Sequence, residues 1–145
     1  MTGRPVPSVG VSRGLSRGLD GEDHAVPNGS GREEIWKRLS KQAEAARVAG
    51  AEIVVVQGLG FVGSVMAAVV ANARNVNGGV QYFVIGVDLP TRESYWKVAM
   101  LAAGRAPVVS EDPDVQEYCR RGAIESGNLT AVADEETTAR ARAAQ

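Results

Sequence analysis

The sequence predicts an α/β fold in which helices flank a parallel sheet of three strands, in the order 3-2-1. Short apolar runs at 53–56, 82–87 and 129–132 have the length and composition of buried parallel strands. Stretches with helical periodicity separate these runs. A glycine-rich turn follows the first run directly, and an acidic residue follows the second. Together these three observations indicate alternating strands and helices, which build a parallel sheet.

The N-terminal segment lacks this pattern. Residues 1–29 are rich in Gly, Pro, Ser and Arg and show no hydrophobic period, which predicts a disordered arm. A short repeat, Ser-Arg-Gly-Leu at 12–15 and again at 16–19, could be a contact motif, although low-complexity sequence is the favoured interpretation. The ordered domain is therefore expected over residues 30–145.

A helix is expected to open this domain. Ser30 and Glu33 stand in capping-box register. An apolar face follows at helical spacing, formed by Ile35, Leu39, Ala43 and Ala46. Gly50 is the natural stop, so the helix should end at about residue 48 and pack on the outside of the sheet.

The turn after the first strand reads Gly58-x-Gly60-x-x-Gly63, and Asp88 ends the second strand. A strand, a glycine turn, a helix and a strand ending in an acid form the dinucleotide-binding fingerprint of the Rossmann fold. Gly58 permits the tight turn, Gly60 lets the backbone approach a pyrophosphate, and Gly63 lets the helix lie close to the sheet. The helix N-terminus would bind the phosphates, and Asp88 would bind the adenosine ribose. A carboxylate there repels a 2′-phosphate, so the pattern favours NAD over NADP.

The helices between the strands follow from periodicity and capping signals. After the glycine turn, one face is predicted to contact the sheet, formed by Val62, Val65, Met66, Val69 and Val70. A stop and a turn follow at 72–79. A second helix is expected over about 93–103, with Thr91 as its N-cap and Gly104 as its end. Three of its residues should face inward: Trp96, Met100 and Ala103.

A third helix is expected over 114–121. Glu111 and Asp112 precede it beside Pro113 and are interpreted as its cap rather than as an acid–base pair. A final helix should open at Asp134.

Composition excludes several classes of function. The net charge is −1, so nothing indicates binding of nucleic acid. The single cysteine, Cys119, allows no intrachain disulfide, and the single histidine, His24, argues against a zinc site or a histidine-based catalytic centre. No apolar stretch approaches the roughly 18 residues of a membrane span, and no signal peptide is recognisable. We therefore expect a cytoplasmic protein with no metal and no membrane partner.

These motifs together resemble the N-terminal domain of the UDP-glucose/GDP-mannose dehydrogenase family, the nucleotide-sugar 6-dehydrogenases. Residues 58–63 are similar to the family's Gly-x-Gly-[Tyr/Phe]-Val-Gly, and residues 85–88 to its Val-Gly-Val-Asp. Residues 101–107, with Glu111 downstream, resemble its Leu-x-x-Gly-x-x-Pro and the acid that follows. Residues 127–134 resemble its third strand, so the resemblance covers about residues 50–136.

The resemblance implies a function and a site. Such enzymes use two molecules of NAD and a cysteine thiol to oxidise the C6 alcohol of a UDP- or GDP-sugar to the uronate. The expected cofactor-binding residues are Gly58, Leu59, Gly60, Phe61, Val62, Gly63, Asp88 and Arg92. The family's catalytic cysteine and lysine lie in a region that this chain does not match. We therefore expect no catalytic residue here, a structural role for Cys119, and a sugar nucleotide as partner only in a full-length enzyme.

Two other interpretations stay open. The chain could be a stand-alone NAD-binding or regulatory module. It could also be a fragment of a 6-phosphogluconate or hydroxyacid dehydrogenase, which shares the glycine turn but lacks the Gly104-x-x-Pro107 loop. Nothing after Val132 has the pattern of a fourth strand, so the first strand is expected at an exposed sheet edge through which the chain self-associates.

Overall fold

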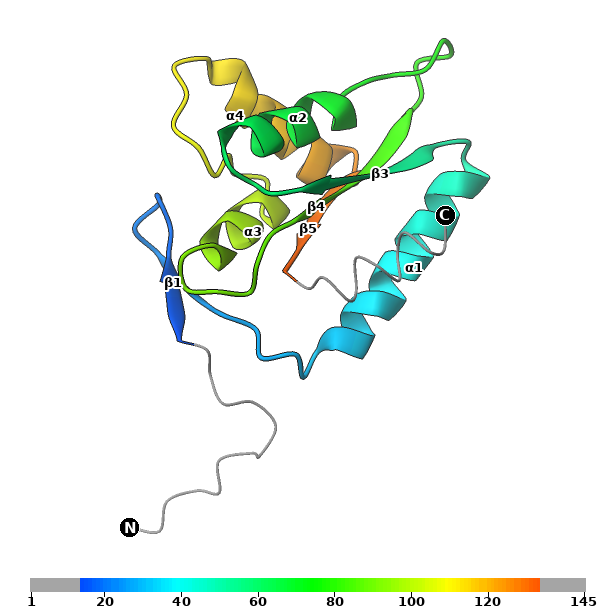
Figure 1. The fold of residues 1–145 in the computed structure, drawn as a ribbon. Helices are drawn as coiled ribbons and strands as arrows, with labels where there is room; N and C mark the ends of the chain where they lie inside the picture. Colours follow the sequence, from blue (N-terminus) through cyan, green and yellow to red (C-terminus); the bar gives the residue numbers. More distant parts are fainter. Residues whose placement is uncertain (1–13, 134–145) are drawn as a thin grey trace, which may run out of the picture.

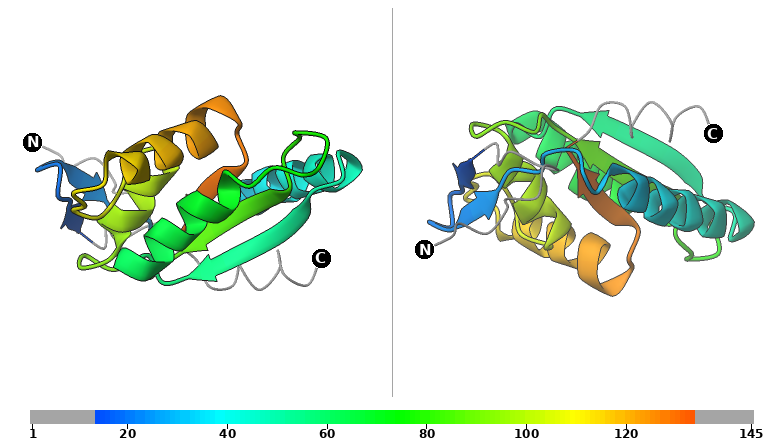
Figure 2. Two further views of the ribbon diagram at one scale, coloured as in Figure 1. Left: turned by 90° about the horizontal axis from the view of Figure 1, so that it is seen from above. Right: turned by 90° about the horizontal axis from the view of Figure 1, so that it is seen from below.

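The computed structural model describes residues 14–133, which form three layers with a parallel sheet in the middle (Figures 1 and 2). The sheet contains β3 (Glu52–Gln57), β4 (Tyr82–Val87) and β5 (Leu129–Val132), in the order β3-β4-β5. The strands predicted first, second and third are β3, β4 and β5, so the predicted order 3-2-1 is the observed order read from β5 to β3. This arrangement confirms the predicted fold class, a Rossmann-like half-fold. The helix predicted from Asp134 lies outside the described residues.

Both faces of the sheet are covered by helices. One face carries α2 (Phe61–Ala71), α3 (Tyr95–Ala102) and α4 (Pro113–Arg120), and the other carries α1 (Arg32–Val48) (Figure 2). Side chains of β4 alternate between the two cores: Val84 packs with Leu59 and Leu101 on the α2 side, whereas Phe83 and Ile85 pack on the α1 side. The central strand is thus buried on both faces, as the apolar run predicts.

The first helix of the domain forms as expected but begins differently. Its N-cap is Gly31, and no side chain among the described residues caps it, so the predicted capping box of Ser30 and Glu33 is wrong. The backbone turns before the helix starts, because the N–H of Ser30 donates to Asn28 Oδ1 at 2.9 Å. Gly50 ends the helix as predicted, with φ of 89°, the left-handed conformation that favours glycine.

The orientation of α2 differs from the prediction. Small residues face the sheet, namely Ser64, Ala67, Ala68 and Ala71, whereas Val62, Met66 and Val69 are 73%, 52% and 50% exposed. The helix is apolar on every side, so periodicity could not identify the buried side. We call the three exposed residues, Val62, Met66 and Val69, the outer face of α2.

The N-terminal segment is folded over part of its length. Residues 14–29 include an antiparallel hairpin of β1 (Leu15–Arg17) and β2 (Asp23–Ala25), so the prediction of a disordered arm is wrong for this stretch, and residues 1–13 lie outside the described range. Ser16, in the second copy of the repeat, is fully buried. Its hydroxyl donates to Arg92 O at 2.6 Å and accepts from the Trp96 N–H at 2.9 Å. Ser16 therefore caps α3 from a distant part of the sequence.

The two α-helices in the crossover between β4 and β5 match their predictions only in part. In α3 the buried residues are Val98, Met100 and Leu101, while Ala103 is exposed, contrary to expectation. The cap predicted for α4 is confirmed, because the Asp112 side chain accepts from the Asp114 N–H at 2.9 Å.

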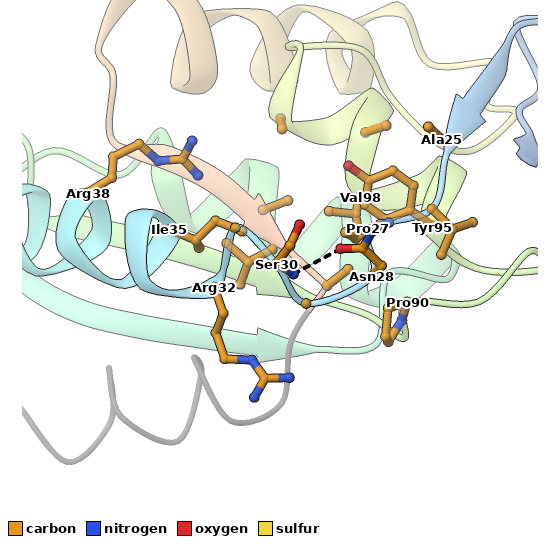
Figure 3. A pocket seen from close by; sticks show the side chains of 18 residues that line it. Ala25, Pro27, Asn28, Ser30, Arg32, Ile35, Arg38, Pro90, Tyr95 and Val98 are labelled. Carbon is orange, nitrogen blue, oxygen red and sulfur yellow. Dashed lines mark hydrogen bonds between the residues drawn. The ribbon is translucent and has the colours of Figure 1, made fainter. Parts of the chain in front are cut away.

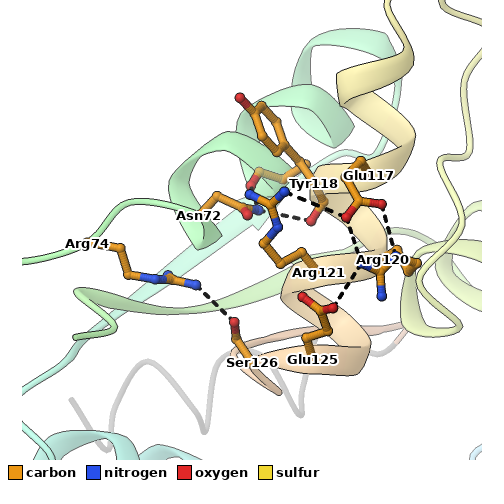
Figure 4. Close-up of polar contacts among 9 residues, drawn as sticks. Asn72, Arg74, Glu117, Tyr118, Arg120, Arg121, Glu125 and Ser126 are labelled. Carbon is orange, nitrogen blue, oxygen red and sulfur yellow. Dashed lines mark hydrogen bonds and ion pairs between the residues drawn. The ribbon is translucent and has the colours of Figure 1, made fainter. Parts of the chain in front are cut away.

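A π-helical turn, η1 (Arg121–Glu125), then extends α4. Figure 4 shows the Arg120 guanidinium bridging Glu117 at 2.6 Å and Glu125 at 3.0 Å across this junction. Among residues 14–133, no helix has the length and apolarity that a membrane span requires.

Candidate dinucleotide-binding site

The glycine turn joins the carboxyl end of β3 to α2, and its three glycines have different environments. Gly58 has φ of 90°, which a side chain would strain. A Cβ on Gly63 would collide with the backbone carbonyl of Gly58, so the helix can approach the turn only when this residue is glycine. A Cβ on Gly60 would meet no atom within 4 Å, so space is open above this residue. Leu59, between the first two glycines, is fully buried and anchors the turn in the core.

The N-terminus of α2 is arranged to attract an anion. Gly60 is the N-cap, no described side chain caps the helix, and the first turn contains no acidic residue. Ser64 is buried and donates its hydroxyl hydrogen to Leu59 O at 2.8 Å, which fixes the turn from within the helix. The backbone N–H groups and the positive end of the helix dipole therefore lie beside the open space at Gly60. Phe61 and Val62 belong to this turn, and both side chains are exposed.

Asp88 connects the second strand with the glycine turn. Its Oδ2 accepts from the Leu59 N–H at 2.8 Å, and its Oδ1 accepts from the Leu89 N–H at 2.8 Å. Burial alone would raise the pKa of this carboxyl. The two backbone hydrogen bonds and the ammonium of Lys97 outweigh burial, so the pKa of Asp88 lies below its ordinary value. The acid is thus ionised and held at the turn.

Lys97 is the site residue that the sequence reasoning missed. Its Nζ lies 3.1 Å from Asp88 Oδ2, and the lysine and aspartate side chains are only 19% and 11% exposed. The sequence indicates this role only through position, because Lys97 lies in the first turn of the helix that follows Asp88. Arg92 was the predicted cation, but its Nε lies 3.5 Å from Leu15 O, against the hairpin.

These residues fit the adenosine-diphosphate half of a dinucleotide. Space is open above Gly60, the helix N-terminus is uncapped, and a carboxylate stands at the end of the neighbouring strand. Phosphates placed on the turn would meet N–H donors, and a ribose placed beyond them would meet a carboxylate acceptor. The structure thus brings the predicted residues of the turn together with Asp88.

A separate cavity of about 430 Å³ lies elsewhere on the domain. Figure 3 shows it between the start of α1 and α3, beside the end of β5, and none of the glycine-turn residues lines it. Its walls include Ile35, Val98 and Tyr95, and burial raises the pKa of the Tyr95 phenol. The linker from the hairpin to α1 closes one side, so this cavity depends on the N-terminal segment.

A cluster of three possible metal ligands lies in the hairpin. Atoms of Asp20, Glu22 and His24 lie within 4.8 Å of one another. The guanidinium of Arg105 lies 2.8 Å from Asp20 and 3.4 Å from Glu22, so it supplies the positive charge that pairs with both carboxylates. The cluster therefore fastens the hairpin to the loop after α3.

Cys119 is fully buried in the core between α2, α4 and the sheet. Burial raises the pKa of its thiol to about 11. A thiol in such an environment is protonated near neutral pH and is a poor nucleophile. These properties agree with the structural role expected for this residue.

Comparison with solved structures finds a likeness to part of a nucleotide-sugar dehydrogenase. No protein-family model and no curated protein sequence matches the chain. The crystal structure of NDP-N-acetyl-D-galactosaminuronic acid dehydrogenase from Methanosarcina mazei Go1 is similar to it, with a TM-score of 0.50 and 25% sequence identity. The match covers 66% of this chain and 18% of that dehydrogenase, so the likeness spans less than a fifth of the longer protein. The described part of the chain is thus a Rossmann-like half-fold that resembles part of a nucleotide-sugar dehydrogenase.

Proposed function

We propose that this chain binds NAD through the adenosine-diphosphate half of the cofactor and forms the cofactor-binding portion of a nucleotide-sugar 6-dehydrogenase. The observation that carries the proposal is the hydrogen bond from the Leu59 N–H to Asp88 Oδ2, at 2.8 Å. It places the acid of the second strand at the turn where the uncapped α2 begins. Phosphate-binding and ribose-binding groups therefore stand next to one another.

Each residue has a defined part in this proposal. The pyrophosphate would lie over Gly60, where the open space and the N–H groups of Phe61 and Val62 meet. Gly58 and Gly63 allow the turn and α2 to lie close together, and Asp88 would accept a hydrogen bond from one ribose hydroxyl. When bound, NAD supplies the hydride-accepting group. In this proposal, the residues that bind and oxidise the sugar nucleotide belong to a larger enzyme.

A second candidate is a stand-alone NAD-binding or regulatory module, and one observation favours it. The helix α1 precedes β3 and covers the face of the sheet opposite α2, burying Leu39 against Phe83 and Ile85. In the described residues, helices therefore cover both faces of the sheet and form three layers. Both candidates require the same cofactor site.

Calorimetric titration of the purified chain tests the proposal. We expect saturable binding of NAD and of ADP-ribose, which lacks the nicotinamide but retains the half that the site contacts. AMP should bind more weakly, because it has no pyrophosphate to place on the turn. Absence of NAD binding by a folded chain would refute both candidates.

A further inference from the structure

We propose that Lys97 is a specificity-determining residue that weakens the discrimination of Asp88 against a phosphate on the adenosine 2′ oxygen. The inference rests on the proposed function, since it concerns which dinucleotide occupies the same site. A bare carboxylate at the end of the second strand would repel a 2′-phosphate. In this chain the carboxylate is paired with a cation.

The geometry of the pair supports this assignment. Lys97 Nζ lies 3.1 Å from Asp88 Oδ2, the same oxygen that accepts from Leu59. Both side chains are largely buried, so solvent screens the pair less than an exposed ion pair. The positive charge therefore lies beside the carboxylate oxygen that bonds the turn, next to the position proposed for the ribose.

The number of hydrogen bonds that the Asp88 carboxylate already accepts also supports a role for Lys97 in binding. The Asp88 oxygens already accept from two backbone N–H groups and from Lys97, out of about four acceptor positions. Little capacity is left for two ribose hydroxyls. The ammonium of Lys97 has three donors, so it can bond a ribose oxygen or a phosphate oxygen directly.

No other described side chain forms an ion pair with Asp88. Arg92 is the nearest arginine in the sequence, but its Nε points at Leu15 O. The selectivity effect is therefore assigned to Lys97 and not to Arg92.

The test is the ratio of the NADP and NAD dissociation constants in matched variants. In Lys97→Met we expect this ratio to rise at least about tenfold, because the carboxylate is no longer neutralised. Lys97→Gln should act in the same direction while retaining an amide donor to Asp88, which guards against loss of the fold. Lys97→Arg should keep the wild-type ratio, and so should the control Lys41→Met, which changes an exposed lysine of α1. Circular dichroism verifies that each variant is folded.

The outcomes separate this inference from the proposed function. If NAD binds and the ratio in folded Lys97→Met and Lys97→Gln equals that of the wild type, the role of Lys97 is refuted and the NAD site stands. If the folded wild-type chain binds neither dinucleotide, the proposed function and this inference fail together. A ratio that falls in Lys97→Met would also overturn the inference, because it would mean that the lysine repels the phosphorylated cofactor.

Discussion

Asp88 and Leu59 are joined by a hydrogen bond of 2.8 Å across 29 residues of sequence. The bond runs from a backbone N–H in the glycine turn to a carboxylate at the end of the neighbouring strand. It fixes the distance between the two halves of the candidate site before any ligand binds. Preorganisation of this kind reduces the ordering cost of binding.

The glycines of the turn should respond differently to substitution. Gly60→Val adds a side chain to open space, so the fold should persist while NAD binding is lost, because the pyrophosphate position is filled. Gly63→Ala adds a Cβ that collides with the Gly58 carbonyl, so it should lower the free energy of unfolding by about 3 kcal/mol. Urea denaturation and NAD titration measure the two effects. Unchanged NAD affinity in Gly60→Val would place the phosphates elsewhere.

The pH dependence of stability should reveal Asp88. Its pKa is lower in the folded state, so its contribution is present above the unfolded pKa of about 4 and is lost as pH falls through the folded value. Asp88→Asn should therefore be less stable than the wild type near neutral pH, by about 2 kcal/mol. The difference should shrink at pH values below 4. A constant difference between pH 7 and pH 2.5 in chemical denaturation would contradict this account.

The hydroxyl of Ser16 should contribute to stability through α3. Ser16→Ala removes the bond to the Trp96 N–H and the bond to Arg92 O, and should cost about 1–2 kcal/mol. Ser40→Ala is the matched control, because the buried Ser40 hydroxyl has no hydrogen-bond partner among the described residues. Equal losses in the two variants would argue against the cap.

The chain should self-associate through the sheet edge at β3, which pairs only with β4 among the described strands. We expect the outer face of α2 to be a second surface that a neighbouring copy contacts. Val62, Met66 and Val69 lie on one side of a helix without charged residues, and a helix that is apolar all round is usually buried. Met66→Glu should shift the protein towards monomer in sedimentation velocity. Val76→Glu, at an exposed valine in the turn before β4, should not. A wild-type chain that is monomeric at every concentration would refute the prediction.

The isolated chain should not oxidise UDP-glucose or GDP-mannose. Its one cysteine, Cys119, is buried, and burial raises the pKa of its thiol to about 11, so it supplies almost no thiolate at neutral pH. The measurement is the absorbance of NADH at saturating NAD and sugar nucleotide. Activity that disappears in Cys119→Ser would make this cysteine catalytic, contrary to our expectation.

The parts of the fold that follow local rules could be predicted from the sequence. The strand at Tyr82–Val87 is recognisable because its apolar run is short and ends in an acid, and Gly50 and Gly104 mark helix ends through their positive φ. The glycine turn and Asp88 were predicted as neighbours, and the structure places them within one hydrogen bond of each other.

The remaining features depend on contacts between distant segments. Ser16 looks like part of a low-complexity repeat, and only its hydrogen bond from the distant Trp96 N–H makes it a cap. The helix α2 gives no polar side to indicate its orientation, so the burial of its alanines follows from the close approach at Gly63. Lys97 becomes a site residue only because α3 returns to the end of β4.

The position of α1 before β3 has a consequence for synthesis of the protein. A ribosome produces α1 before any strand of the parallel sheet, so the apolar side of α1 is available when each of these strands emerges. The buried cluster around Leu39 is complete only after Phe83 and Ile85 have been synthesised. A polypeptide that started directly at β3 would leave these aromatic and aliphatic side chains in water. The domain boundary that matters for expression therefore lies upstream of the glycine turn and of α1, in front of the β1–β2 hairpin, because Ser16 of this hairpin caps α3.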